Sequence, residues 1–381
     1  GATIDTFTNE GTIGNGVSKF GITVWGKDGS KSTINNFSNS GTISSNAGEA
    51  IYLGNTEIKT FTNSGTISST TKQGINIASG STIDNFSNNG TIQGGSNTAS
   101  INLGADKQNG VTIESFENSG IIGNGSSKYA ITTWGKSDNK STINNFSNSG
   151  TIHSNNGESI YLGNTEIKTF NNSGIINTNS TFGVNIASGT TIDNFTNTGT
   201  IKSTGTIQPT ANVNVSTGVY LQGLVKTFTN EGLISGIMGI KLVKSSMGTF
   251  INKGTIESTS SNTIAAGISL ATYYGSPSTI ENLTNEGLIK SKSNGIQAEA
   301  GNYINTIINK GTIEADLNGI TFYAASDGSS GEIMKLGRII LENGSSIKAG
   351  NNGINIDGTS KDIEAEAIEV QSGAVVEGGN S

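Results

Sequence analysis

The sequence predicts an all-β protein, a parallel β-solenoid of about 13 coils with three strands per coil. Three observations lead to this fold class. A short unit, in which an apolar residue is followed by Asn two, Gly four and Ile six positions later, returns at intervals of 22 to 34 residues. A second signature with alternating apolar residues follows each unit. The stretch KSTINNFSNSGTI, which contains the unit, occurs at 31–43 and again at 140–152.

The first strand of each coil is expected around the apolar residue that opens the unit. This residue is Phe in the earlier copies, and Leu283, Ile307 and Leu341 in the last three. In stretches such as TIDNF, β-branched and aromatic residues favour a strand. We expect these side chains to point inward and to stack on their equivalents one coil away, which would form the core.

The Asn of the unit is expected at the turn between the first and second strands. It recurs without exception, at Asn9, Asn39, Asn63, Asn88, Asn118, Asn148, Asn172, Asn197, Asn230, Asn252, Asn285, Asn309 and Asn343. Stacked amides at such a turn bond to backbone groups and to one another, so we predict a buried Asn ladder. A row of external ligand contacts is the alternative. The GTI segment that ends the unit predicts the second strand, with its Ile inward.

The third strand is expected at segments such as GITV, AIYL and GVYL. Their period of two places two apolar side chains inward and the residue between them outward. Exposed aromatic residues among amides and hydroxyls suit stacking on sugar rings or hydrogen bonding to another protein face. The alternative is that surface Tyr and Thr simply favour strands. The binding residues that this pattern predicts are Trp25, Tyr52, Trp134, Tyr161 and Tyr220.

A long internal duplication organises the first half of the chain. Residues 3–94 align with 112–203 without a gap, and roughly two-thirds of the positions are identical. We therefore expect one β-helix over 1–381 that begins with two tandem four-coil blocks. The blocks are 1–109 and 110–204, more divergent coils come next over 205–362, and 363–381 reads as a degenerate terminal coil. The duplication reflects either recent copying or a surface that is needed twice.

Composition excludes several classes of function. The chain has no cysteine and one histidine, which removes disulfides and thiolate chemistry. Its formal net charge of −7 argues against a nucleic-acid partner, since such a partner needs a basic face. No apolar run approaches the roughly 18 residues of a membrane-spanning helix. No nucleotide-binding or calcium-binding motif occurs, and we expect no cofactor and no metal.

Stacked units of the form NFxNSGTI followed by GIxI resemble the passenger domains of Gram-negative autotransporters, the type V secreted surface proteins. The Asn- and Lys-rich style is most similar to passengers of Campylobacter and Helicobacter relatives. The resemblance covers essentially the whole chain and implies a right-handed, single-stranded parallel β-helix. It also implies export through the outer membrane, display at the cell surface, and a C-terminal outer-membrane β-barrel outside this sequence. Solenoid motifs encode coils rather than chemistry, so the resemblance says less about function.

Some β-helix proteins act on polysaccharides, which makes catalytic carboxylates and histidine the residues to consider for an enzyme. His153 is the only histidine, and it follows the inward Ile152, which predicts that it faces solvent. The candidate paired carboxylates are Asp84, Glu114 and Glu117 on neighbouring coils, or Glu57 and its duplicate Glu166. A lyase also needs a basic residue or calcium over an acidic groove, and the sequence does not visibly assemble one. We therefore expect a protein that is not an enzyme.

The sequence as a whole favours a cell-surface adhesin that binds through a long polar and aromatic face of the β-helix. Its partner would be the same protein on a neighbouring cell, or a host glycan or matrix protein. The alternatives are a purely structural stalk that displays another module, and a polysaccharide-active β-helix enzyme.

Overall fold

The computed structural model describes residues 1–14, 19–27, 29–78, 80–104, 109–123, 127–209, 215–271, 276–299, 301–323, 334–358 and 363–379. Every regular element within these ranges is a β-strand. The chain forms two compact units, Gly1–Asp193 (unit 1) and Asn194–Ser381 (unit 2). Each unit is a β-solenoid with three strands per coil, and together they hold about 12 turns. The predicted fold class is therefore confirmed.

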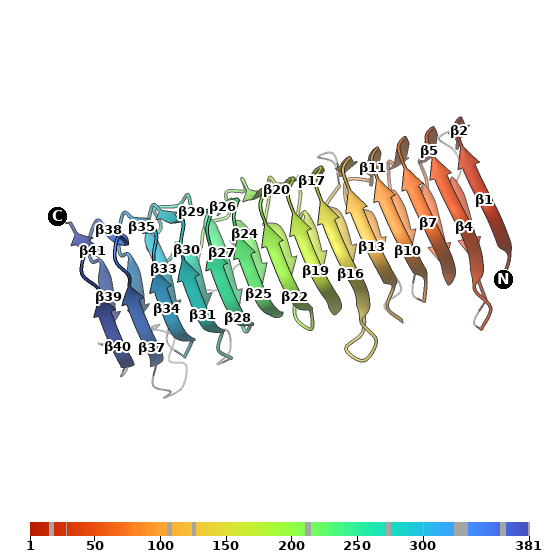
Figure 1. The fold of residues 1–381 in the computed structure, drawn as a ribbon. Coiled ribbons are helices and arrows are strands. Elements are labelled where there is room, and N and C mark those ends of the chain that lie inside the picture. The colour runs from red at the N-terminus through yellow and green to blue at the C-terminus, as the bar shows by residue number, and fades with distance from the viewer. Residues whose placement is uncertain are drawn as a thin grey trace. The chain divides into compact units, whose positions relative to one another are not determined.

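In unit 1 each turn adds one strand to each of three parallel sheets, as the side-by-side arrows of Figure 1 show. The first sheet contains β1 (Thr3–Asn9), β4 (Ser32–Asn39), β7 (Thr56–Asn63), β10 (Thr82–Asn88), β13 (Thr112–Asn118), β16 (Ser141–Asn148) and β19 (Thr165–Asn172). The second contains β2 (Thr12–Ile13), β5 (Thr42–Ser45), β8 (Thr66–Ser69), β11 (Thr91–Gln93), β14 (Ile121–Ile122), β17 (Thr151–Ser154) and β20 (Ile175–Thr178). The third contains β3 (Ile22–Trp25), β6 (Ile51–Gly54), β9 (Ile75–Ile77), β12 (Ala99–Leu103), β15 (Tyr129–Thr133), β18 (Ile160–Leu162) and β21 (Phe182–Ile186).

Unit 2 repeats this arrangement, and β22 (Thr191–Asn197) contains the boundary between the units. Its first sheet contains β25 (Leu224–Asn230), β28 (Ser246–Asn252), β31 (Thr279–Asn285), β34 (Tyr303–Asn309), β37 (Met334–Leu341) and β40 (Ile363–Val370). The second contains β23 (Thr200–Ser203), β26 (Leu233–Gly236), β29 (Thr255–Ser258), β32 (Leu288–Ser291), β35 (Thr312–Ala315), β38 (Ser346–Ala349) and β41 (Val375–Gly378). The third contains β24 (Thr217–Leu221), β27 (Met238–Val243), β30 (Ala266–Ala271), β33 (Asn294–Glu299), β36 (Ile320–Tyr323) and β39 (Ile354–Asp357).

The core of unit 1 is a column of stacked phenylalanines in the first sheet. The register pairs each Phe with its equivalent one coil away, as in Phe116 with Phe146 and Phe146 with Phe170. Ring centroids along the column are 4.5 to 5.0 Å apart, which is one strand spacing. The Ile of each unit and the apolar pairs of the third strands fill the remaining interior. The inward positions predicted from the repeat are confirmed.

The predicted Asn ladder is also confirmed. Its side chains are buried from Asn9 to Asn172 in unit 1 and from Asn197 to Asn309 in unit 2. Each Nδ2 donates to the Oδ1 of the next Asn in the same unit at 2.7 to 2.8 Å. The same nitrogen donates to the carbonyl of the Gly two residues later, for example Gly150 at 3.3 Å. The ladder therefore satisfies a buried turn in every coil.

The last copy of the unit departs from the prediction. The motif places Leu341 at the Phe position and Asn343 in the ladder, but β37 places Leu341 opposite Asn309. Ile347 still lies opposite Ile313, so six positions separate Leu341 from Ile347 where four separate Asn309 from Ile313. The turn is two residues longer and leaves Asn343 exposed. The prediction for this copy is wrong because a longer turn cannot be read from the motif spacing.

Candidate functional site

The outward column of the third sheet in unit 1 is mostly buried. Asn76, Asn102 and Thr132 are between 3% and 8% exposed. Thr132 Oγ1 donates to Asn102 Oδ1 at 2.7 Å, and Asn102 Nδ2 donates to Asn76 Oδ1 at 3.2 Å. The expectation of a long exposed polar face is wrong for this column. Short polar groups one strand spacing apart bond to one another instead of to an external partner.

Aromatic side chains remain accessible at two places along this face. At the first place Trp25, at the end of β3, is 63% exposed. Its ring stacks on the half-buried Tyr52 of β6 with 4.7 Å between centroids and 27° between planes. Phe20 meets Tyr52 edge-on at 6.2 Å. We call Phe20, Trp25 and Tyr52 the first aromatic cluster.

The second aromatic cluster consists of Tyr129, Trp134 and Tyr161, each 109 positions after its equivalent in the first cluster. Trp134 and Tyr161 have centroids 4.6 Å apart, and Tyr129 lies 6.4 Å from Tyr161. All three side chains are half-buried. Both clusters lie in unit 1, and four strand spacings place them about 19 Å apart. The structure therefore brings four of the five predicted binding residues into two matching groups.

A glycine makes room for the rings of the first cluster. Gly54, which ends β6, lies opposite Trp25 in the register. A Cβ at Gly54 would lie 2.8 Å from Trp25 Cε3 and 3.1 Å from Tyr52 Cε1. The tryptophan thus packs over bare backbone. At Gly163, the equivalent in the second copy, a Cβ would lie 2.8 Å from Tyr161 Cε1.

A short hairpin comes after each tryptophan and is tied to the neighbouring coil. Lys27 and Ser30 pair across the first hairpin, and Lys136 and Asn139 across the second. The carbonyl of Lys27 accepts a hydrogen bond from Asn55 Nδ2 at 2.7 Å. Asn55 occupies the left-handed region at φ 48°, where Asn is better tolerated than most residues. These contacts fix where the chain leaves the tryptophan.

The second hairpin is held in the same way. Asn164 lies at φ 46°, and its Nδ2 donates to the carbonyl of Gly135 at 3.0 Å. Buried serines also hold the tryptophan carbonyls, with Ser32 Oγ 2.7 Å from Trp25 O and Ser141 Oγ 2.6 Å from Trp134 O. Both tryptophans are therefore positioned by residues that the duplication repeats.

Each cluster is bordered by a carboxylate and an amide. Asn76 Nδ2 donates to Glu49 Oε1 at 3.1 Å, and Asn185 Nδ2 donates to Glu158 Oε1 at 3.2 Å. Burial raises the pKa of Glu158, an effect partly offset by its hydrogen bonds and by Lys128. Burial, together with the nearby Glu158, also raises the pKa of Tyr161. The second cluster is thus a partly dehydrated polar environment.

Each cluster is also bordered by a lysine. Lys19 Nζ lies 5.4 Å from the centroid of Phe20, and Lys128 Nζ lies 5.1 Å from that of Tyr129. A ring face attracts an ammonium group at this distance. Aromatic rings, amides, carboxylates and ammonium groups are thus assembled twice in the same pattern, which can bind a sugar ring and its hydroxyls.

Tyr220 does not take part in such a group. The alternation predicts an exposed side chain on β24, but Tyr220 is only 7% exposed, and its hydroxyl accepts a hydrogen bond from Gln222 Nε2 at 3.2 Å. All five residues of β24 are buried. Tyr220 is therefore removed from the candidate binding residues.

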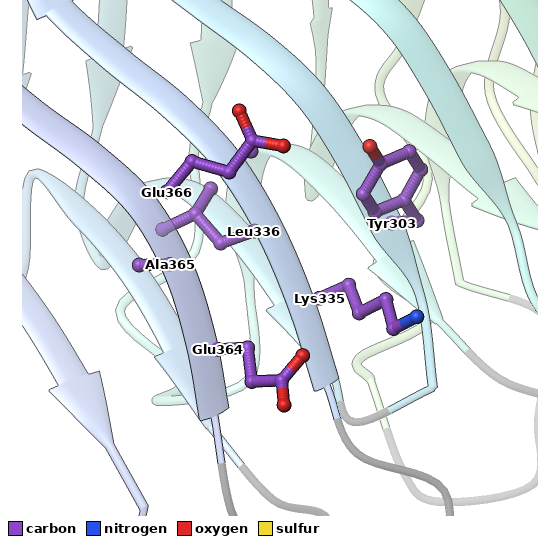
Figure 2. Close-up of a pocket in the computed structure, with 7 residues that line it drawn as sticks. Tyr303, Lys335, Leu336, Glu364, Ala365 and Glu366 are labelled. Atoms are coloured by element: carbon purple, nitrogen blue, oxygen red, sulfur yellow. The ribbon is translucent and has the colours of Figure 1, made fainter.

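A pocket of about 340 Å³ lies on the outer face of the first sheet of unit 2. Its lining residues are Tyr303, Lys335, Leu336, Gly337, Glu364, Ala365 and Glu366. Figure 2 shows that they come from the neighbouring strands β34, β37 and β40. Lys335 lies opposite Glu364 in the register, and Tyr303 Oη donates to Asn305 Oδ1 at 2.7 Å. The pocket offers one ring, one ammonium and two carboxylates to a small polar ligand.

Three of the carboxylates considered for an enzyme make ordinary surface contacts. Glu166 forms an ion pair with Lys140 at 3.2 Å. Glu114 accepts a hydrogen bond from Asn144, and Glu117 accepts one from Ser115 at 3.3 Å. Exposed pairs of this kind contribute little to stability. Within the described ranges, no group of three or more His, Asp or Glu side chains is arranged to hold a metal ion.

His153 is half-buried rather than freely solvated. Its Nδ1 lies 3.1 Å from the carbonyl of Asn177, and its Nε2 lies 2.9 Å from Asn155 Oδ1. Both ring nitrogens thus contact amide oxygens, whereas a proton relay would need a nucleophile and a carboxylate there.

Sequence reasoning missed Phe20, Tyr129 and the two glycines under the rings. The available signal was the duplication, since Gly54 recurs as Gly163 and an aromatic residue stands at both 20 and 129. The repeat motif alone could not reveal the two additional aromatic residues, because Phe20 and Tyr129 precede the alternating segment.

Comparisons with protein families, with curated proteins and with solved structures give no match. Nor does any helix among the described residues have the length and apolarity needed to cross a membrane.

Proposed function

We propose that this protein is the adhesin passenger of a Gram-negative autotransporter, displayed at the cell surface, and that it binds carbohydrate through its two aromatic clusters. One observation carries the binding proposal: the duplication builds the same arrangement of Trp, Tyr, Lys, Glu and Asn twice on one face of unit 1. The surface location rests on the resemblance of the repeat units.

The chemistry of the clusters suits a sugar. The apolar face of a pyranose stacks on an indole or phenol ring, while amides and carboxylates bond to its hydroxyls. Trp25 is exposed, its ring packs over Gly54, and its carbonyl accepts a hydrogen bond from Ser32. Little conformational freedom is therefore lost when a ligand binds. A carbohydrate therefore fits the clusters better than a long protein face does, because the polar column between them is buried.

We also propose that the protein is not an enzyme. Glu364 and Glu366 are the two carboxylates that line the pocket, and both side chains are exposed. Purified protein is expected to release no products from a panel of polysaccharides. Release of products would overturn this part of the proposal, and loss of turnover in the Glu364→Gln/Glu366→Gln variant would then place the catalysis at the pocket.

Binding is tested by comparing cells that display the full-length protein with cells that display Trp25→Ala/Trp134→Ala. We expect the wild type to adhere to glycan-coated surfaces and the double variant to adhere at least about tenfold less, since stacking of a sugar on a ring contributes on the order of 1 to 2 kcal/mol. The matched control is Tyr303→Ala, which removes an aromatic residue from the pocket of unit 2.

Three outcomes would contradict the proposal. Equal adhesion of the wild type and the double variant would remove the clusters from the site. Equal loss in Tyr303→Ala would transfer it to the pocket. Clumping of wild-type cells with one another, without glycan binding, would favour self-association. Protease treatment of intact cells tests the location, because a surface protein is cleaved without lysis.

A further inference from the structure

We infer that the two aromatic clusters select anionic sugars, with the ring on the tryptophan and the carboxylate or sulfate directed to the lysines beside it. This inference rests on the proposed carbohydrate binding and names the class of ligand. It depends on where the lysines of unit 1 lie and on which charges the duplication repeats.

One ammonium group in each cluster is linked to the tryptophan through a chain of ring contacts. In the first cluster Lys19 Nζ lies over Phe20, Phe20 touches Tyr52, and Tyr52 stacks on Trp25. In the second cluster Lys128 follows the same path through Tyr129 and Tyr161 to Trp134. Both lysines are exposed, and neither forms a salt bridge within the described residues. Each ammonium can therefore meet an anionic group on a bound sugar.

The hairpins place a further lysine beyond the other end of each third strand, after the tryptophan. Lys27 lies two residues after Trp25, and Lys136 lies two residues after Trp134. Both are exposed at the antiparallel pair of their hairpin. The backbone of each hairpin is held by Asn55 or Asn164, so these charges are carried on an anchored loop. Each tryptophan thus has one lysine before it and one after it.

The carboxylate beside each cluster is engaged with an amide. Glu49 accepts from Asn76, and Glu158 accepts from Asn185. Glu158 is half-buried, and burial raises its pKa, which weakens its competition with an acidic ligand as the pH falls. The lysines face solvent at both clusters, where Lys128 also interacts with Glu158 and the second hairpin adds the exposed Asp138.

The duplication keeps the lysines around the tryptophans in place. Lys19 and Lys27 recur as lysines in the second copy. The duplication does not keep the acidic residue after Lys27 in place. In the second copy Asp28 is replaced by serine, and Asp138 stands one position later. In a chain with a net charge of −7, the repeated solvent-facing feature is a local positive charge beside the aromatic rings. Complementary charge of this kind favours an anionic partner.

The experiment measures binding of the purified chain to polygalacturonate and to its fully methyl-esterified form, which has the same backbone without the charge. Dextran sulfate and dextran form a second pair that distinguishes sulfate from carboxylate. We expect affinity for at least one anionic polymer to exceed that for its neutral partner by about tenfold at low salt, and the preference to shrink as salt is added.

The decisive variant is Lys19→Gln/Lys128→Gln, which should lose this preference and keep the weaker binding to the neutral polymer. The matched control is Lys59→Gln/Lys168→Gln. It removes the same charge from another pair of duplicated, exposed lysines, which lie on the first sheet, and should keep the preference.

The outcomes separate this inference from the function on which it rests. Equal binding of charged and neutral polymers, abolished by Trp25→Ala/Trp134→Ala, would leave carbohydrate binding intact and overturn the anionic preference. Equal loss of preference in the control variant would show a diffuse charge effect and would also overturn it. Failure of the wild type to bind any of the four polymers would contradict both proposals.

Discussion

Single polar residues decide which parts of this chain are interior. The ladder Asn side chains are buried yet fully hydrogen-bonded, each to an amide above and a glycine carbonyl beside it. Thr132, Asn102 and Asn76 form a shorter ladder on the outside of the third sheet. In both places the partner of a polar group is its equivalent one coil away, so register and hydrogen bonding reinforce each other.

Asn148→Leu is expected to destabilise unit 1 by about 2 to 4 kcal/mol, although leucine is more hydrophobic. The change removes the bonds to Asn172 and Gly150 and takes away the side-chain oxygen to which Asn118 Nδ2 donates at 2.7 Å. Leucine occupies the equivalent position at Leu341, but there the turn is two residues longer. Chemical denaturation measures the change in free energy of unfolding.

The control for this substitution is Asn145→Leu on the same strand, because Asn145 is exposed. It should change the free energy of unfolding by less than about 0.5 kcal/mol. Equal stability of the two variants would mean that the ladder hydrogen bonds contribute nothing.

Glu158→Gln is expected to stabilise unit 1 near neutral pH. Because the folded pKa of Glu158 is raised above its ordinary value of 4.5, the folded state binds the proton more tightly than the unfolded state. The wild type therefore loses stability as pH rises from 4.5 through the folded pKa, and the variant lacks this loss. Thermal melts should show a higher Tm for the variant at about pH 7 and converge below pH 4.5. A difference that grows toward acid pH would reverse the assigned direction.

At the scale of one strand, the tryptophan sites depend on the residues just beyond the strand end. β3 ends at Trp25, a hairpin comes next, and Asn55 of the adjacent coil binds the hairpin carbonyl. β6 ends in Gly54, which leaves the space that the indole occupies. Strand ends, rather than the regular strand interiors, therefore build the candidate site.

Gly54→Ala is expected to weaken ligand binding at the first cluster by about tenfold, because the new Cβ would displace the indole by contact at 2.8 Å. The measurement is made in a Trp134→Ala background, where only the first cluster binds. Gly11→Ala is the control, since a Cβ at Gly11 meets nothing within 4 Å. Unchanged affinity in Gly54→Ala would show that the stacked arrangement of Trp25 and Tyr52 is not the binding form.

The repeat units predicted the regular parts of each coil because a solenoid brings equivalent residues together. Phe146, Asn148 and Ile152 could be placed from spacing alone, and the structure agrees. Spacing alone could not place Leu341 or Tyr220. The position of Leu341 depends on the length of the turn, and the burial of Tyr220 depends on the surroundings of β24. For the site, outward parity identified Trp25 and Tyr52, but their direct stacking depends on Gly54 and on the hairpin geometry.

Across unit 1, the coils turn a duplicated sequence into two matching aromatic clusters on one face. The first sheet pairs without a break from β1 to β19, through registers that place each Phe on the next. Nearest-neighbour stacking of this kind makes a stiff scaffold. Two clusters four coils apart are therefore held at a fixed spacing of about 19 Å.

A fixed spacing has a measurable consequence for multivalent ligands. Trp25→Ala/Tyr52→Ala removes the first cluster and leaves the second. On an immobilised polysaccharide the affinity should fall by about 100-fold, because the second binding event on a rigid scaffold is intramolecular. For a short oligosaccharide in solution, calorimetry should show half the wild-type stoichiometry at an unchanged Kd. If the immobilised ligand binds this variant as tightly as the wild type, the second copy contributes no avidity, and the duplication serves the scaffold alone.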